Sequence, residues 1–167
     1  MSKPISFEAS SVSGGGLAKA IATSFWVGHI GFAPGTFGTI PGLLLFVLAS
    51  LIGLGPLAYL VLVAAVFAVG VWAAGKAEQA YGKKDDGKIV IDEVVGAMVT
   101  MFYMPLDWRL LIAGFLVFRF FDVFKPGFRR VERVKGGLGV MLDDVIGGVM
   151  ANVTLWILLL VEGLFRG

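Results

Sequence analysis

Long apolar runs separated by short polar loops dominate the chain. Five of them are long enough to enter a membrane: Ile40–Leu54, Pro56–Ala74, Ile89–Met104, Trp108–Phe124 and Val145–Phe165. A helix needs about 20 residues to cross a bilayer core, so the shorter runs predict tilted, interrupted or partly inserted helices. The fold class predicted is all-α, a polytopic membrane helical bundle of about five transmembrane or partly inserted helices, with four or six crossings as alternatives.

The N-terminal part of the chain lacks a signal-peptide pattern. No apolar core followed by a small-residue cleavage site occurs there, so we expect residues 1–24 to be a retained cytoplasmic tail. Residues 25–167 are expected to form a single membrane-embedded domain. Phe25 and Trp26 predict an interfacial helix that anchors its start.

Composition narrows the class further. Hydrophobic residues make up 57% of the chain and charged residues only 16%, whereas soluble domains carry about a quarter charged residues. The absence of cysteine excludes a thiol nucleophile and a thiolate metal site. The net charge of +2, without a long basic stripe, predicts no nucleic-acid partner. Composition favours no particular oligomeric state.

Basic residues orient the chain. They gather in two loops and comprise Lys76, Lys83, Lys84 and Lys88 in the first, and Lys125, Arg129, Arg130, Arg133 and Lys135 in the second. The positive-inside rule places both loops in the cytoplasm, with two crossings between them.

This topology gathers the acidic residues on one side. Asp92 and Glu93 start the third run, Asp122 ends the fourth, and Asp143 and Asp144 start the fifth, all at the cytoplasmic face. Carboxylates that crowd together repel one another, and a divalent metal relieves that repulsion. All-oxygen ligands without histidine or cysteine predict Mg²⁺ or a similar hard cation, with one member of each adjacent pair sufficient as a ligand.

Groups that suit a phosphate surround these acids. Arg119 and Lys125 flank Asp122 at three residues on either side, where all three can share a helix face. Two glycine-rich stretches precede expected helices, where backbone amides can approach an anion, and they contain Gly35, Thr36, Gly38 and Thr39 in the first and Gly136, Gly137 and Gly139 in the second. Metal-binding acids, cations and glycine loops together predict a phosphate site.

Other interpretations of the same residues stay open. Asp122 can simply pair with Arg119, the acid pairs can compensate helix dipoles, and the glycines can be plain turns. A cation channel or transporter with an acidic ion site is an alternative function, as is a lipid-phosphate enzyme acting on phosphatidic acid. A non-catalytic scaffold would leave the gathered acids without a role.

Four ordered motifs, "APGTFGT", "VIDEVVG", "FRFFDVFKP" and "GGLGVMLDDVIGG", resemble those of the phosphatidylglycerophosphatase A family over about residues 25–150. The resemblance implies a Mg²⁺-dependent phosphatase of the bacterial cytoplasmic membrane, with its active site facing the cytoplasm. Its substrate would be phosphatidylglycerophosphate and its products phosphatidylglycerol and inorganic phosphate.

The resemblance also assigns residues. It places the family acids on Asp92, Glu93, Asp122, Asp143 and Asp144, and the remaining motif groups on Arg119, Lys125 and Thr36. Two departures affect loop shape: Gly127-Phe128 stands where a second proline is expected, and Thr39 where serine is common. Metal-assisted hydrolysis is the expected mechanism, with either direct water attack or an aspartyl-phosphate on Asp143 or Asp144. Thr36 is a less favoured nucleophile because no base lies beside it in the sequence.

Overall fold

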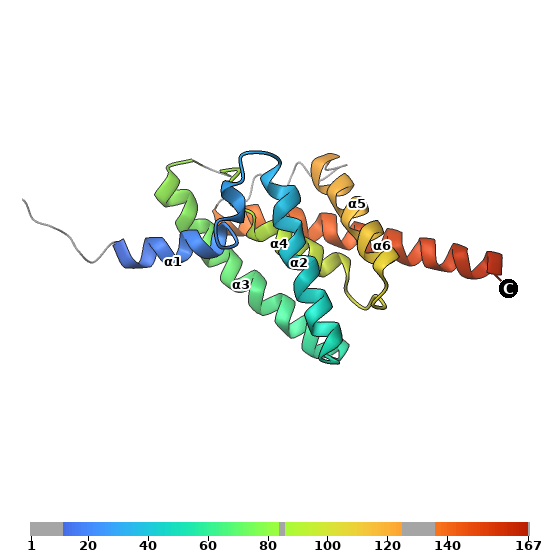
Figure 1. Ribbon diagram of the computed structural model, residues 1–167. Helices are drawn as coiled ribbons and strands as arrows, with labels where there is room; N and C mark the ends of the chain where they lie inside the picture. The colour runs from blue at the N-terminus through green and yellow to red at the C-terminus, as the bar shows by residue number, and fades with distance from the viewer. Residues whose placement is uncertain (1–11, 84–85, 125–135, 167) are drawn as a thin grey trace, which may run out of the picture.

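A computed structural model of the chain describes residues 12–83, 86–124 and 136–166. These residues form helices and connecting turns, with no strand among them. The elements are α1 (Val12–Ala22), the short 3-10 helix η1 (Val27–His29), α2 (Pro34–Leu51), α3 (Pro56–Tyr81), α4 (Ile91–Thr100), α5 (Trp108–Phe124) and α6 (Gly137–Arg166). Figure 1 shows α2 and α3 joined at one end and opening into a V, in which α2 packs on α4 while α3 packs on α6 and α4. The all-α fold is confirmed.

Within the described part of the chain, three helices are long and apolar enough to cross a membrane: α2, α3 and residues 137–164 of α6. The five predicted runs correspond to α2 through α6, but several predicted boundaries were wrong. α2 begins at Pro34 rather than Ile40, and α6 begins at Gly137 rather than Val145. α4 has only ten residues, which is about half of what a crossing needs. It enters the bundle without spanning it.

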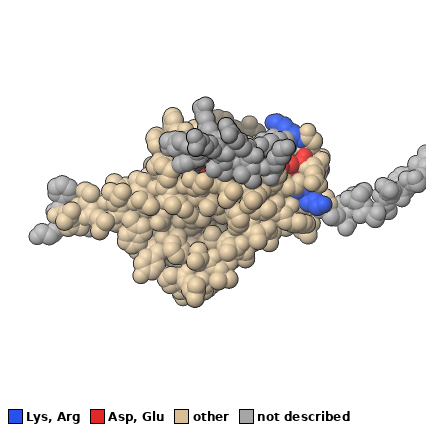
Figure 2. Space-filling view, turned by 180° about the vertical axis from the view of Figure 1, so that it is seen from behind, with Lys and Arg blue, Asp and Glu red and all other residues tan. Residues whose placement is uncertain are grey.

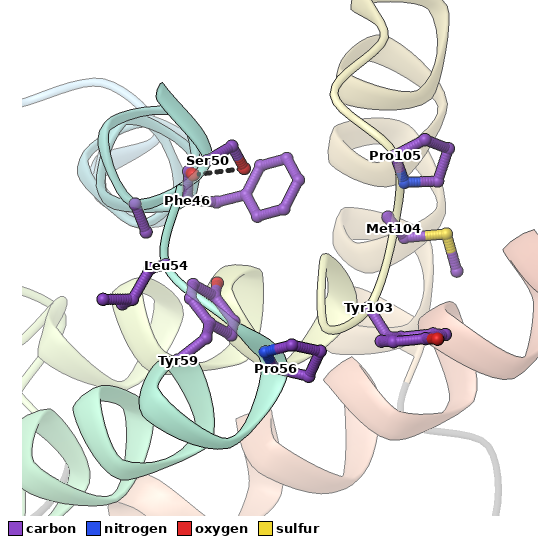
Figure 3. A pocket seen from close by; sticks show the side chains of 9 residues that line it. Phe46, Ser50, Leu54, Pro56, Tyr59, Tyr103, Met104 and Pro105 are labelled. Carbon is purple, nitrogen blue, oxygen red and sulfur yellow. Dashed lines mark hydrogen bonds between the residues drawn. The ribbon is translucent and has the colours of Figure 1, made fainter. Parts of the chain in front are cut away.

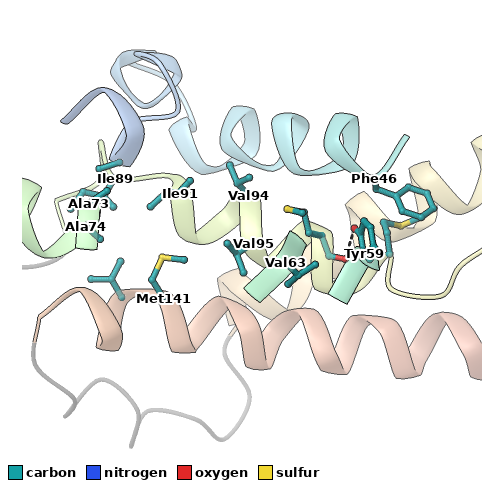
Figure 4. Close-up of a cluster of buried hydrophobic side chains, with 14 of the residues drawn as sticks. Phe46, Tyr59, Val63, Ala73, Ala74, Ile89, Ile91, Val94, Val95 and Met141 are labelled. Carbon is teal, nitrogen blue, oxygen red and sulfur yellow. Dashed lines mark hydrogen bonds between the residues drawn. The ribbon is translucent and has the colours of Figure 1, made fainter. Parts of the chain in front are cut away.

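α4 lies at the centre of the bundle. Eight of its ten residues are buried, and it packs mainly against α2 and α6. Figure 4 shows its Val94 and Val95 between those two helices. Glycines permit the close approach, because a Cβ on Gly42 of α2 would lie 2.7 Å from the Cβ of Ala97, and one on Gly148 of α6 would lie 3.0 Å from the Cβ of Val99. Small residues at helix contacts are the usual means of tight packing in lipid.

Side chains from two other helices cap the C-terminal end of α4. The Tyr59 hydroxyl donates to the Met98 carbonyl at 2.9 Å. Asn152 donates through Nδ2 to the carbonyls of Thr100 and Phe102, at 2.9 and 2.8 Å. A helix end in hydrocarbon exposes carbonyls that water cannot reach, and each unsatisfied group costs several kcal/mol. These donors from α3 and α6 allow α4 to end inside the bundle.

The predicted tail contains a folded element. Residues 12–22 of the range 1–24 form α1, which packs against α3. Ala18 and Ala22 are fully buried there. The sequence around α1 is rich in glycine and alanine, so its buried face is made of small side chains and carries a weak apolar signal. The placement of this segment in the cytoplasm stays a prediction.

The turn after α1 has a left-handed backbone conformation, and a hydrogen bond connects the end of α1 to the segment before α4. Residues 24–26 have φ values of 46°, 54° and 70°, a region that non-glycine residues rarely occupy. The Thr23 hydroxyl accepts a hydrogen bond from the Trp26 amide at 3.1 Å. The Val90 amide donates to the Ala22 carbonyl at 2.8 Å. The predicted interfacial helix is therefore interrupted, although Phe25 and Trp26 remain exposed.

Charge is confined to a small part of the visible surface. In Figure 2 the few charged side chains lie at one end of the molecule, and the other described residues on that face are uncharged.

The C-terminal end of α2, the start of α3 and the turn after α4 enclose a cavity of about 330 Å³. Figure 3 shows Phe46, Tyr59 and Tyr103 around it. This cavity lies at the opposite end of α2 from the acids described next.

Candidate active site

Three carboxylates from two helices meet inside the bundle. Asp92 and Glu93 of α4 and Asp144 of α6 each offer one oxygen, and these three oxygens lie within 4.8 Å of one another. Asp92 and Asp144 are buried, at 8% and 2% exposure, and the Glu93 side chain is 14% exposed. The sequence expects one acid of each adjacent pair to reach a common centre. The structure brings both Asp92 and Glu93 there.

The packing of α4 on α6 explains why these acids meet. Asp92 and Glu93 occupy the first turn of α4, where the positive end of the helix dipole stabilises carboxylates. Gly96 follows Asp92 by four residues and so shares its helix face. A Cβ on Gly96 would lie 2.9 Å from the Asp144 carbonyl oxygen. Gly96 was not among the predicted site residues, although its spacing of four residues from Asp92 is a signal in the sequence that points to it.

Arg119 links the fourth acid to this group. The guanidinium of Arg119 forms an ion pair with Asp122 one turn along α5. The same nitrogen lies 4.0 Å from Glu93 Oε1. Asp122 stands outside the group of three carboxylates, and its charge is matched by Arg119. The structure therefore contains the pairing that the sequence left open, and places it beside the buried acids.

Two further predicted residues have different positions. Asp143 is partly buried next to Asp144 but does not belong to the group of three carboxylates. Lys125 lies outside the residues that the structure describes.

The first turn of α2 touches the acids. A Cβ on Gly35 would collide with Glu93 Oε1 and approach Arg119 Nη1 to 2.9 Å, so only glycine fits there without moving a side chain. Thr36 follows in the same turn and is partly buried. Thr39 is fully buried, and its hydroxyl donates to the Gly35 carbonyl at 2.9 Å. A Cβ on Gly38 would lie 2.7 Å from Val90 Cβ, which gives this glycine a role in packing α2 on α4.

The second glycine stretch is not the loop that the sequence predicts. α6 begins at Gly137, so only Gly136, with a φ of 73°, remains outside the helix. Gly137 packs against the Val71 carbonyl and Gly75 of α3, and Gly139 is a buried residue of the first turn. Asp144 follows Gly137 by seven residues, about 10 Å along the axis. Gly137 therefore joins α6 to α3 at some distance from the acids.

The donor set fits a metal ion. The three carboxylates supply only oxygen ligands, and hard divalent cations prefer such ligands. The Glu93 Oε2 atom is buried and accepts no hydrogen bond from any residue that the structure describes. Among the residues that the structure describes, Arg119 is the one cation paired with these three carboxylates, at 4.0 Å from Glu93, which leaves excess negative charge. Asp92, Glu93 and Asp144 could therefore hold a cation.

Comparison with known proteins identifies the family. The family model described as phosphatidylglycerophosphatase A matches residues 20–159, a range that contains every acid of the site. The chain belongs to this family. It is 36% identical over 140 residues to phosphatidylglycerophosphatase A of Haemophilus influenzae, covering 81% of this chain and 85% of that protein. It is 32% identical over 134 residues to the Escherichia coli protein of the same name, covering 78% and 77%.

Another bacterial relative carries a different name. A Bacteroides thetaiotaomicron protein named as a candidate phosphatidylinositol-3-phosphatase is 38% identical over 146 residues, covering 82% of this chain and 90% of that protein. No solved structure gives a significant match. Membership of the phosphatidylglycerophosphatase A family makes this chain a phosphoric monoester hydrolase associated with membranes.

Proposed function

We propose that this protein removes the terminal phosphate of phosphatidylglycerophosphate at the cytoplasmic face of the bacterial inner membrane, using Mg²⁺. The observation that carries the proposal is the meeting of three carboxylates, two of them buried, beside Arg119 in a chain of the phosphatidylglycerophosphatase A family. Asp92, Glu93 and Asp144 would hold the ion. When bound, Mg²⁺ supplies charge neutralisation at phosphate oxygens and increases the acidity of water.

The side chains around the three carboxylates have separate tasks in this proposal. Arg119 already faces Glu93 and Asp122, and its remaining N–H groups donate to the phosphoryl oxygens as their negative charge grows. Lys125 of the same motif adds a second cation. The first turn of α2, with Gly35 against Glu93 and Thr36 next to it, lets backbone approach the phosphate. We assign Gly38, Thr39, Gly136, Gly137 and Gly139 to helix packing and turns.

We assign Asp143 to proton transfer or to nucleophilic attack, because it directly precedes Asp144 and does not belong to the group of three carboxylates. In hydrolysis an oxygen forms a bond to phosphorus while the bond from phosphorus to the lipid oxygen breaks. A proton then reaches the departing lipid oxygen. Asp143 either accepts the proton of an attacking water or supplies the attacking oxygen itself, in which case water later releases the phosphate.

The cytoplasmic orientation rests on charge. Lys76, Lys83 and Lys88 precede α4, and the start of α4 carries two of the three carboxylates. The positive-inside rule puts these lysines, and with them the acids, at the cytoplasmic side.

A second candidate substrate is phosphatidylinositol 3-phosphate. The name of the Bacteroides thetaiotaomicron relative, at 38% identity, favours it. Both lipids carry a phosphomonoester on an anionic glycerophospholipid, so the same carboxylates and Arg119 would serve either one. What differs is the alcohol that leaves.

The test is phosphate release by the purified protein in detergent micelles. The panel contains phosphatidylglycerophosphate, phosphatidylinositol 3-phosphate and phosphatidic acid, each with EDTA and after Mg²⁺ is restored. We expect hydrolysis of phosphatidylglycerophosphate that EDTA abolishes and Mg²⁺ recovers. Preferred hydrolysis of another lipid would contradict the proposed substrate. Activity that EDTA leaves unaffected would contradict the proposed use of Mg²⁺.

Substitutions test the residues. Asp92→Asn and Asp144→Asn should each lower phosphate release by about 100-fold, since each removes a charged ligand. Asp107→Asn is the matched control, because Asp107 is exposed and accepts a hydrogen bond from the Arg109 amide in the turn before α5. Near-normal release by both site variants would refute the assignment.

A further inference from the structure

An apolar groove runs along α2 next to the active site. It has a volume of about 320 Å³ and lies between the turn after α1, α2, the middle of α3 and the start of α4. Pro41, Leu44 and Leu48 form one wall, and Val66 and Ile91 lie on the other helices. Nearly all of its described lining is hydrocarbon, which suits a flexible apolar chain.

One polar group stands in this lining. Ser24 is 9% exposed, and its hydroxyl oxygen makes no hydrogen bond with any residue that the structure describes. A buried hydroxyl without a partner loses its hydrogen bonds to water and gains none in return, which destabilises the folded protein. Bulk hydrocarbon cannot recover that cost, but a ligand that brings a hydrogen-bond acceptor can. The groove therefore suits an apolar ligand that places a hydrogen-bond acceptor next to the Ser24 hydroxyl.

The groove starts at the depth of the acids. Ile91, which lines it, directly precedes Asp92. The contacts of Gly38 with Val90 and of Gly42 with Val94 and Ala97 hold α2 alongside α4. From Pro41 to Leu48 the wall extends about 10 Å along α2, away from the acids. A lipid whose phosphate lies at the carboxylates could reach this groove with its glycerol and one acyl chain.

We propose that the groove holds one acyl chain of the lipid substrate and that the Ser24 hydroxyl donates a hydrogen bond to an ester carbonyl of the same molecule. The identity of the lipid headgroup, whose phosphate lies at the carboxylates, rests on the proposed function. The groove itself adds a chain-binding site that is lined by Pro41, Leu44 and Leu48 of α2.

The kinetic test compares two substrates of the full-length protein in micelles: long-chain phosphatidylglycerophosphate and its deacylated headgroup compound, glycerophosphoglycerophosphate. Leu44→Trp fills the groove and should raise KM for the long-chain lipid about tenfold, while kcat/KM for the deacylated compound stays unchanged. Ser24→Ala should raise the same KM about fivefold, the weight of a neutral hydrogen bond. Leu116→Trp, on an exposed position of α5, is the matched control and should change neither value.

Equal losses on both substrates, or no loss with Leu44→Trp, would overturn the groove assignment. Failure of the unsubstituted protein to hydrolyse either compound would instead contradict the proposed function. A measurement without turnover separates the two cases.

That measurement uses phosphatidylglycerophosphate with a diazirine in one acyl chain and maps the cross-linked residues by mass spectrometry. We expect labels on residues 21–25 and 41–48, competed by unlabelled phosphatidylglycerophosphate but not by phosphatidylcholine, and lost in Leu44→Trp. Competition by phosphatidylcholine would identify a general lipid site. Labels spread evenly over the exposed faces of α5 and α6 would refute the proposal.

Discussion

The capping of α4 by Asn152 gives the sharpest prediction for stability. Asn152→Leu keeps the volume of the side chain but removes both hydrogen bonds from Nδ2 to the carbonyls of Thr100 and Phe102. The Thr100 carbonyl at the end of α4 and the Phe102 carbonyl in the turn that follows then lack these donors. Because α4 begins with Asp92 and Glu93, the substitution acts on the helix that carries two of the three carboxylates.

The magnitude follows from the number of bonds lost. Hydrogen bonds between helices in a membrane contribute about 0.6 kcal/mol on average and about 1.7 kcal/mol at most. Two such bonds give a loss of about 1–3 kcal/mol in the free energy of unfolding. The upper part of this range applies here, since both acceptors lie at a helix end rather than within a helix.

Titration of the purified protein from mild detergent into SDS, followed by tryptophan fluorescence, measures this free energy. Thr154→Val on the same helix is the control. The Thr154 hydroxyl donates to the Met150 carbonyl within α6, which also belongs to the helical hydrogen-bond ladder, so we expect a change below about 0.5 kcal/mol. If Asn152→Leu and Thr154→Val unfold at the same SDS fraction, the capping argument is refuted.

Three further substitutions test the contacts of the site. Gly42→Ala forces a Cβ against a backbone carbonyl of α4 and should lower the free energy of unfolding by about 1–3 kcal/mol in the same SDS titration. Gly163→Ala is the control and should not destabilise the protein, because open space surrounds Gly163. Equal stability of the two variants would contradict the packing of α2 on α4. In Gly35→Ala the atoms nearest to the added Cβ are the ends of the Glu93 and Arg119 side chains, which can move. Unfolding should therefore change little, while phosphate release falls about tenfold or more. Full activity would exclude a tight fit there. Arg119→Lys loses the guanidinium fork and should lower kcat about 10- to 100-fold, which an unchanged kcat would disprove.

The sequence alone was sufficient to predict the gathering of the acids. Basic loops oriented the apolar runs, and that orientation brought Asp92, Glu93 and Asp144 to one side. It could not decide which acids meet, because that depends on how closely α4 approaches α6. This distance is set by Gly96 and Gly148, whose contacts involve parts of the chain about 50 residues apart.

Helix boundaries were harder to predict than helix existence. Glycine disfavours helices by about 1 kcal/mol relative to alanine, so "PGTFGT" and "GGLG" indicated loops. In the structure Gly35 and Gly38 lie in α2 and Gly137 lies in α6, where the close contacts of Gly38 with Val90 and of Gly137 with α3 compensate the lost propensity. The C-terminal end of α4 could not be predicted from the local sequence, because the side chains that cap it, Tyr59 and Asn152, belong to α3 and α6.

The shortness of α4 has a consequence for how the protein is made. Chains enter the membrane from the N-terminus, so α4 leaves the ribosome before α6, against which it packs most extensively. Ten residues that carry two carboxylates cannot hold a place in the bilayer alone. We expect α4 to settle only after α6 has been synthesised. Asp144 arrives with that last helix, and a nascent chain that stops before residue 137 therefore has neither a settled α4 nor a complete set of carboxylates.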